Sequence, residues 1–270
     1  MPRLADADLR ANADRQSAAF FRAAGAEPWA TLHDEPDVIH GTTGIPLAIF
    51  NGATGARFEP ATADERIEAV LRPFREQAID MSWWVGPTST PVDLATRIAA
   101  RGLVVDEEVP ILARLLDGWT AEPPAAGIEI ERVSDPAGYR VATDIMFEAF
   151  GLPRGVFDVV VERYAGLSIG PRAVQHTYLA RLDGRAVGTS LGFVVEGVVG
   201  VYNVATLEDA RRRGVGAAIT AAAVAGGLAD GAVATLLETS PLGRPVYERL
   251  GFREIGSVTI LVGAFGSSSS

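Results

Sequence analysis

The sequence contains no cysteine and no lysine. Without cysteine, disulfides, thiolate metal ligands and cysteine nucleophiles are excluded. Only three histidines are present, His33, His40 and His176, and their spacing matches no metal-binding pattern, so we expect no metal. All 24 basic side chains are arginines, and the GxxxxGK[ST] pattern of a nucleotide-kinase P-loop is absent.

The sequence also lacks a long hydrophobic run and an excess of positive charge. Residues 1–10 have no apolar signal core, and the apolar stretch near Ala217–Leu228 is too short and too rich in small residues to span a bilayer. The net charge of −10 argues against nucleic-acid binding, which needs a basic face. Since 48% of the residues are hydrophobic and 21% charged, we expect a globular cytoplasmic protein of one or two domains, with neither membrane nor nucleic acid as a partner.

The most informative stretch is Val198–Leu228, which reads as a strand, a polar connection, an arginine cluster and an Ala-rich helix. The first amides of a helix have no intrahelical partner, and the helix dipole places partial positive charge there. Glycines let the backbone approach a bulky anion, and arginines supply forked donors that suit phosphate oxygens. The pattern predicts a pyrophosphate site formed by Arg211, Arg212, Arg213, Gly214, Val215, Gly216 and Ala217.

Two other interpretations of Gly214 and Gly216 compete with this one. A dinucleotide-binding fold would place an acidic residue near Glu238, but Ile219 stands where the third glycine belongs and a polar run separates the strand from the glycines. A GxG pair alone is also compatible with a loop before a surface helix whose arginines are simply solvated. The residues downstream of the helix favour the anion site over both.

Those downstream residues, 232–253, read as a buried strand, a Ser-Pro break at Ser240, a short helix with Tyr247 and then Leu250-Gly251-Phe252. Together with the RxxGxG motif this order resembles the GNAT acetyltransferase family, over about residues 128–263. The resemblance implies an α/β (α+β) fold, with a mixed, mostly antiparallel twisted sheet flanked by helices. It also implies acetyl-CoA as cosubstrate and an N-acetyltransferase activity.

The resemblance further assigns roles to residues of two neighbouring strands, 198–206 and 235–240. In the family these strands diverge, and the pantetheine arm lies between them, here against Val204, Ala205 and Thr206. The amide of Val204 would polarise the thioester carbonyl, and Ser240 would line the coenzyme path. Tyr247 matches the family's tyrosine and would protonate the departing thiolate.

The acceptor would be an amine of a small molecule or a peptide, and a carboxylate could remove its proton. Glu238 and Glu196 are the candidates, although a solvated role suits either residue as well. No motif identifies the acceptor, and the sequence leaves a homodimer open. The alternative to an enzyme is a non-catalytic module that senses acyl-CoA or binds a partner.

The two halves of the chain resemble each other. Residues 50–54 (FNGAT) match 202–206 (YNVAT), and a Pro follows the threonine at a spacing of 33 residues in the first half and 35 in the second. The first half has the acidic run of residues 59–65 in place of the phosphate site. We therefore expect a degenerate GNAT-like domain at 1–120, a linker at 121–127, the catalytic domain at 128–265 and a disordered tail at 266–270; a chance similarity of two strand–helix–strand units is the alternative.

Local patterns predict three further elements. Ile45–Phe50 reads as a buried strand, and Asp183-Gly184 marks the turn of a hairpin. Leu103–Val105 and Pro110–Leu116 read as the two strands of a hairpin that ends the first half.

Overall fold

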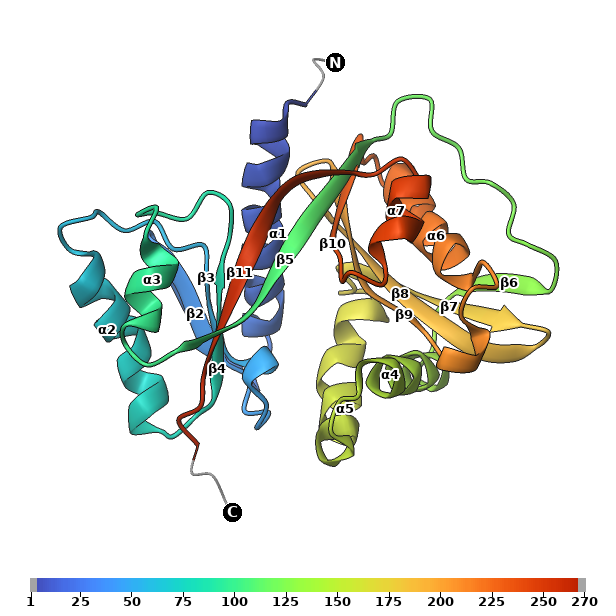
Figure 1. Ribbon diagram of the computed structural model, residues 1–270. Coiled ribbons are helices and arrows are strands. Elements are labelled where there is room, and N and C mark those ends of the chain that lie inside the picture. Colours follow the sequence, from blue (N-terminus) through green and yellow to red (C-terminus); the bar gives the residue numbers. More distant parts are fainter. Residues whose placement is uncertain (1–3, 267–270) are drawn as a thin grey trace. The chain divides into compact units, whose positions relative to one another are not determined.

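The computed structural model describes residues 4–266, so most of the expected tail, 267–270, lies outside the described residues. The chain forms two compact units (Figure 1). We call residues 6–110 together with 256–266 the N-terminal unit, and residues 111–255 the C-terminal unit. None of the helices within residues 4–266 combines the length and the apolar character needed to cross a bilayer.

The N-terminal unit contains the strand order β1-β2-β3-β4-β11, with β5 next to β11. Its elements are α1 (Asp6–Gly25), β1 (Thr31–Glu35), β2 (Val38–Thr42), the 3-10 turn η1 (Ala48–Phe50), β3 (Gly52–Thr54), α2 (Ala63–Glu76), β4 (Met81–Val85), α3 (Leu94–Ala99), the first part of β5 (Val104–Leu115) and most of β11 (Arg253–Gly263). The apolar face of α2, with Ile67, Val70, Leu71 and Phe74, packs into one buried cluster with Trp83 of β4.

The C-terminal unit contains the strand order β5-β10-β9-β8-β7-β6. Its elements are β6 (Ile128–Arg132), α4 (Pro136–Phe150), the 3-10 turn η2 (Arg154–Val156), α5 (Phe157–Ser168), β7 (Gln175–Leu182), β8 (Arg185–Val195), β9 (Val198–Thr206), the 3-10 turn η3 (Glu208–Ala210), α6 (Val215–Ala229), β10 (Ala234–Glu238) and α7 (Arg244–Arg249). Helices α6 and α7 lie on one face of its sheet, and α4 and α5 lie on the other (Figure 1). The predicted hairpin at Asp183-Gly184 is confirmed as the β7–β8 turn.

Most neighbouring strands within residues 4–266 pair antiparallel, but each unit also contains a parallel pair. Gly52–Thr54 of β3 pair in parallel with Ser82–Trp84 of β4, and Val198–Gly200 of β9 pair in parallel with Ala234–Leu236 of β10. In both cases one helix connects the two strands, α2 in the first pair and α6 in the second. The sequence similarity between the halves therefore coincides with the same strand–helix–strand motif in each unit.

Strands β5 and β11 each begin in one unit and end in the other. Within β5, Ile111–Leu115 pair antiparallel with Ala234–Glu238 of β10, and within β11, Thr259–Gly263 pair antiparallel with Met81–Val85 of β4. The first half of the chain thus supplies the strand that pairs with β10, and the second half supplies the strand that pairs with β4. The predicted hairpin of Leu103–Val105 and Pro110–Leu116 is wrong, because both segments belong to the single continuous strand β5.

The predicted strand at Ile45–Phe50 is also wrong. Only the 3-10 turn η1 forms there, because the buried side chain of Asn51 binds this segment locally. The Asn51 amide donates to the carbonyl oxygens of Ile45 and Leu47 at 2.9 and 3.2 Å. These bonds use carbonyls that a sheet neighbour would otherwise need.

Candidate functional site

The site begins where β9 and β10 separate. Their parallel pairing ends at Gly200 and Leu236, although β9 continues to Thr206 and β10 to Glu238. Beyond that point β9 remains paired with β8, and β10 with β5. The facing edges of the two strands therefore diverge in the direction of Thr206, as the resemblance implied.

A bulge in β9 lies inside the diverging part. Leu191 of β8 pairs with Tyr202, but Thr189 pairs with Ala205, so Asn203 and Val204 together face a single residue of β8. Asn203 has a φ of 51°, the left-handed conformation that short polar side chains tolerate best. Such a bulge takes residues out of regular pairing and turns their backbone groups, which is the requirement for an amide aimed between the strands.

Helix α6 begins at the open end of the diverging strands without a cap of its own. Its N-cap is Gly214, with a φ of 90°, and among residues 4–266 no side chain accepts a hydrogen bond from the amides of Val215, Gly216 or Ala217. Helix α4 is different, since Asp135 accepts from the Gly138 amide at 2.9 Å. A Cβ placed on Gly216 would meet nothing closer than the Thr206 hydroxyl at 3.8 Å, so the space in front of this turn is open. The start of α6 therefore fits an anion such as a diphosphate.

The three arginines before α6 have different surroundings. Arg211 is half-buried, and its Nε donates to the Thr206 carbonyl at 3.2 Å, which fixes the loop to the end of β9. Arg213 is exposed and pairs with Asp183 at 3.2 Å. Arg212 is exposed, has a φ of 61° and forms no ion pair within the described part of the chain. Arg212 and Arg213 can supply charge to an anion, whereas Arg211 shapes the loop.

Tyr247 of α7 is buried on the same side of the sheet as α6. Its ring lies against Phe252, with centroids 6.0 Å apart, and its phenol is hydrogen-bonded with the Thr220 side chain of α6. Burial raises the pKa of Tyr247 to about 12, and the Thr220 hydrogen bond opposes part of that rise. The phenol is therefore protonated at neutral pH and can act as a proton donor.

Glu238 and Ser240 follow at the end of β10. Glu238 is exposed. Burial, with the negative charge of Glu238 as the smaller cause, raises the pKa of Tyr202 on β9 well above its usual range. Tyr202 and Glu238 therefore lie near each other on the strands that diverge. The Ser240 hydroxyl accepts from the Gly243 amide at 3.3 Å, so this side chain organises the turn before α7. Glu196 occupies the β8–β9 turn with a φ of 48°.

The corresponding place in the N-terminal unit is closed. After β3 and β4 the chain pairs again, because the Thr90 amide donates to the Ala56 carbonyl at 3.1 Å and the Phe58 amide donates to the Thr90 carbonyl at 3.0 Å. Phe58, which belongs to one of these segments, is buried and lies edge-on to Trp83. Within residues 4–266, these hydrogen bonds close the place that corresponds to the diverging strands of the C-terminal unit.

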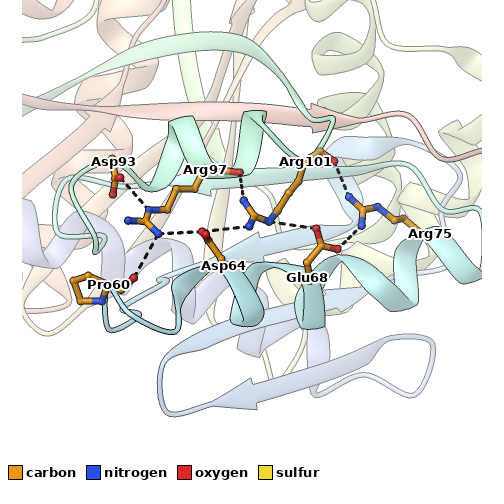
Figure 2. A network of polar contacts seen from close by, with 7 residues as sticks. All are labelled: Pro60, Asp64, Glu68, Arg75, Asp93, Arg97 and Arg101. Atoms are coloured by element: carbon orange, nitrogen blue, oxygen red, sulfur yellow. Dashed lines mark hydrogen bonds and ion pairs between the residues drawn. The ribbon is translucent and has the colours of Figure 1, made fainter.

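Carboxylate side chains also occupy the start of α2, the helix that corresponds to α6. Asp64 is the second residue of α2, as Gly216 is of α6. Its carboxylate binds Arg97 of α3 at 3.0 Å and Arg101, in the turn after α3, at 3.2 Å (Figure 2). Glu68, one turn later, binds Arg101 at 3.3 Å and Arg75 at 2.6 Å. Arg97 holds the pKa of the Asp64 carboxyl below its usual range. The positions that could bind phosphate are occupied by carboxylates with arginine partners.

Three residues of the site were not singled out from the sequence: Tyr202, Thr220 and Arg114. Thr220 lies four residues after Gly216, so helical periodicity could have placed it beside the anion site. Arg114 of β5 donates from Nη1 to the carbonyl of Leu250, the C-cap residue of α7. No sequence signal points to Arg114, because it acts through the strand that comes from the first half of the chain.

Comparison with known proteins agrees with this geometry. Residues 173–254 match the family model described as acetyltransferase (GNAT) domain. A comparison of the sequence with curated proteins found no match. Among solved structures, a GCN5-related N-acetyltransferase from Kribbella flavida is 20% identical with a TM-score of 0.73, covering 92% of this chain and 94% of its own.

Two further structures share the fold over most of the chain. A GCN5-related N-acetyltransferase from Sphaerobacter thermophilus is 16% identical with a TM-score of 0.60, covering 97% of this chain and 94% of its own. A tandem GNAT protein from the clavulanic acid biosynthesis pathway is 13% identical with a TM-score of 0.59, covering 92% of this chain and 88% of its own. The chain thus has the fold of these GNAT structures over most of its length, and residues 173–254 are similar to the GNAT acetyltransferase domain.

Proposed function

We propose that the protein is an acetyl-CoA-dependent N-acetyltransferase with one working site, in residues 128–265, that acts on an amine of a small molecule or a peptide. The observation that carries this proposal is the combination of two features at one place. The strands β9 and β10 diverge, and the uncapped start of α6 lies at the end where they are open. The first feature suits an extended arm and the second suits its diphosphate.

The backbone would bind the cosubstrate. The amides of Val215, Gly216 and Ala217, with the charges of Arg212 and Arg213, are the groups available to hold the diphosphate. Val204, Ala205 and Thr206 border the diverging strands, and the bulge makes the Val204 amide the candidate donor to the thioester carbonyl. One such fixed donor, aimed at a developing oxyanion, contributes roughly 3 kcal/mol to a reaction of this kind.

Two proton transfers would fall to side chains. An alkyl ammonium with a pKa near 10 costs roughly 4 kcal/mol to deprotonate at pH 7, and Glu238 is the candidate base, directly or through water. Tyr247, protonated at neutral pH, would give its proton to the departing thiolate. Ser240 supports this arrangement from the turn that precedes α7.

The N-terminal unit would support the site without binding the cosubstrate. The segments that follow β3 and β4 are hydrogen-bonded to each other, and carboxylates occupy the start of α2. In this proposal the C-terminal copy is catalytic, and the first copy supplies the strand segment Ile111–Leu115 beside β10. Self-association of the chain is compatible with this arrangement and is not required by it.

Calorimetry with acetyl-CoA and an assay for thiol release across a panel of amines and peptides test the proposal together. We expect micromolar binding and acceptor-dependent release of free thiol. Binding without turnover across the whole panel would favour an acyl-CoA sensor over an enzyme. Absence of binding would overturn both functions.

A further inference from the structure

Thr220 connects the start of α6 with Tyr247. It is fully buried, and its hydroxyl donates to the Gly216 carbonyl at 2.8 Å, one helical turn earlier. The same side chain is hydrogen-bonded with the phenol of Tyr247. One hydroxyl therefore contacts both the helical turn that would bind phosphate and the side chain that would supply a proton.

The direction of these hydrogen bonds follows from the number of protons. A threonine hydroxyl has one proton, and a carbonyl oxygen can only accept, so the Thr220 proton is used by the Gly216 carbonyl. The Thr220 oxygen then accepts the phenol proton of Tyr247. In this state the phenol is neutral and its proton points toward α6.

The ring of Tyr247 has little freedom to move away from Thr220. Phe252 lies against one side of it. A Cβ placed on Gly243 would lie 3.0 Å from Cε2 of the Tyr247 ring and 3.1 Å from the Thr239 hydroxyl, so the backbone approaches the ring closely there. The position of the phenol oxygen is therefore set by packing on the ring and by Thr220 at its tip.

We propose that Thr220 is a positioning residue for Tyr247, and this inference rests on the proposed transferase function. When Tyr247 gives its proton away, its O–H bond breaks and an S–H bond forms on the departing thiolate. Thr220 keeps its own proton and turns it from the Gly216 carbonyl to the new phenolate oxygen. The Gly216 carbonyl still accepts the backbone N–H of residue 220 within α6, so this rotation leaves no buried acceptor unpaired.

This role explains why a hydroxyl occupies a fully buried position on an otherwise apolar helix face. A hydrogen bond to the charged form of an acid favours that form, so Thr220 makes Tyr247 a stronger acid than burial alone would allow. Valine has nearly the same shape as threonine without the hydroxyl, and serine keeps the hydroxyl. The pair Thr220→Val and Thr220→Ser therefore separates hydrogen bonding from packing.

Steady-state kinetics and NMR on the full chain provide the test. Thr220→Val should lower kcat about tenfold and leave acetyl-CoA affinity within about twofold, whereas Thr220→Ser should retain most of kcat. In a Tyr247→Phe background Thr220→Val should have no further effect on kcat. The chain has only five tyrosines, so labelling at tyrosine 13Cζ and comparison with Tyr247→Phe assigns the Tyr247 signal. That signal should shift in Thr220→Val and stay in place in Thr220→Ser.

The two parts of the experiment fail in different ways. An unchanged 13Cζ signal in Thr220→Val, or a full additional loss of kcat on top of Tyr247→Phe, would overturn the role of Thr220 even in an active transferase. If the 13Cζ signal shifts as expected in Thr220→Val but the wild-type protein releases no thiol with any acceptor, the proposed function is overturned, and with it the catalytic role of the Thr220–Tyr247 pair.

Discussion

At the scale of single residues, the proposed acyl transfer depends on one buried phenol, that of Tyr247. Tyr247→Phe removes the hydroxyl and keeps the ring that packs on Phe252. We expect kcat to fall by about 100-fold, because a general acid contributes on this order, with acetyl-CoA affinity nearly unchanged. Thiol-release kinetics and calorimetry measure the two quantities. An unchanged kcat would show that the thiolate is protonated by another group.

The raised pKa of Tyr247 also predicts the pH dependence. A proton donor with a pKa of about 12 stays protonated throughout the range in which the protein can be assayed. The rate should rise with pH as the acceptor amine loses its proton, and no fall assignable to Tyr247 should occur below pH 10. A falling limb with a midpoint at pH 8 or 9 that disappears in Tyr247→Phe would contradict this assignment.

The same shift has a consequence for stability. The folded-state pKa lies above the unfolded value of about 10, so the protonated phenol is favoured in the folded protein. Its contribution to the free energy of unfolding is complete below pH 10 and is lost as the pH rises toward 12.

Gly216 offers a direct test of the anion site. Gly216→Glu places a carboxylate at the second position of α6, where the space is open. Acetyl-CoA affinity should fall at least 100-fold, because like charges then meet at the helix start. The thermal midpoint should stay or rise, since Glu is a better helix former than Gly and suits the first turn of a helix.

Ala229→Glu is the matched control, at the exposed last residue of α6. It adds the same charge to the same helix and should leave acetyl-CoA affinity unchanged. If Gly216→Glu binds as the wild type does, the diphosphate is not held at this turn.

Some residues of the site can be predicted from the sequence and others cannot. The glycines and arginines before α6 are recognisable because a helix start that binds anions needs those residue types in that order. Tyr202 and Thr220 are not, because each matters only through a neighbour that the fold brings close, Glu238 for one and Tyr247 for the other.

At the scale of elements, the diverging strands need the segment Ile111–Leu115, which precedes the linker. A fragment of residues 128–265 lacks this segment and leaves one edge of β10 without its partner. It also lacks Arg114, which binds the C-cap carbonyl of α7. We expect this fragment to be poorly soluble and to bind acetyl-CoA at least tenfold more weakly than the full chain.

Circular dichroism and calorimetry on the fragment check this expectation. A matched fragment that starts at residue 104 restores β5 and should recover more of the binding. A 128–265 fragment that folds and binds as tightly as the full chain would show that β5 is dispensable.

Strand and helix patterns are readable wherever local residues decide the structure. The span Val198–Thr206 is a strand as predicted, and the amphipathic pattern that begins at Asp64 is helix α2. The predicted hairpin around Leu103–Leu116 is wrong because its apolar alternation suits one long strand as well as two short ones. Only pairing partners more than a hundred residues away distinguish these cases.

At the scale of the whole molecule, the strand–helix–strand motif occurs twice, and the two occurrences differ at the place where a cosubstrate could bind. In the second motif, β9 and β10 diverge and the start of α6 is uncapped. In the first motif, backbone hydrogen bonds join the segments after β3 and β4, and the carboxylates of Figure 2 occupy the start of α2. We therefore expect one acetyl-CoA per chain by calorimetry. Gly216→Glu should abolish that one event and leave no residual binding, whereas a stoichiometry of two would show that the first copy is also functional.

The exchange of closing strands bears on how the protein is made. Strand β4 leaves the ribosome early, but its partner in β11 follows only after residues 111–255 have been added. At a synthesis rate of about 5–20 residues per second, residues 86–258, which separate β4 from its partner, take roughly 9–35 seconds to add. During this time the growing chain carries an unpaired edge beside a nearly complete core. Newly synthesised chains should therefore depend on chaperones until translation ends, even though the finished protein leaves β4 paired.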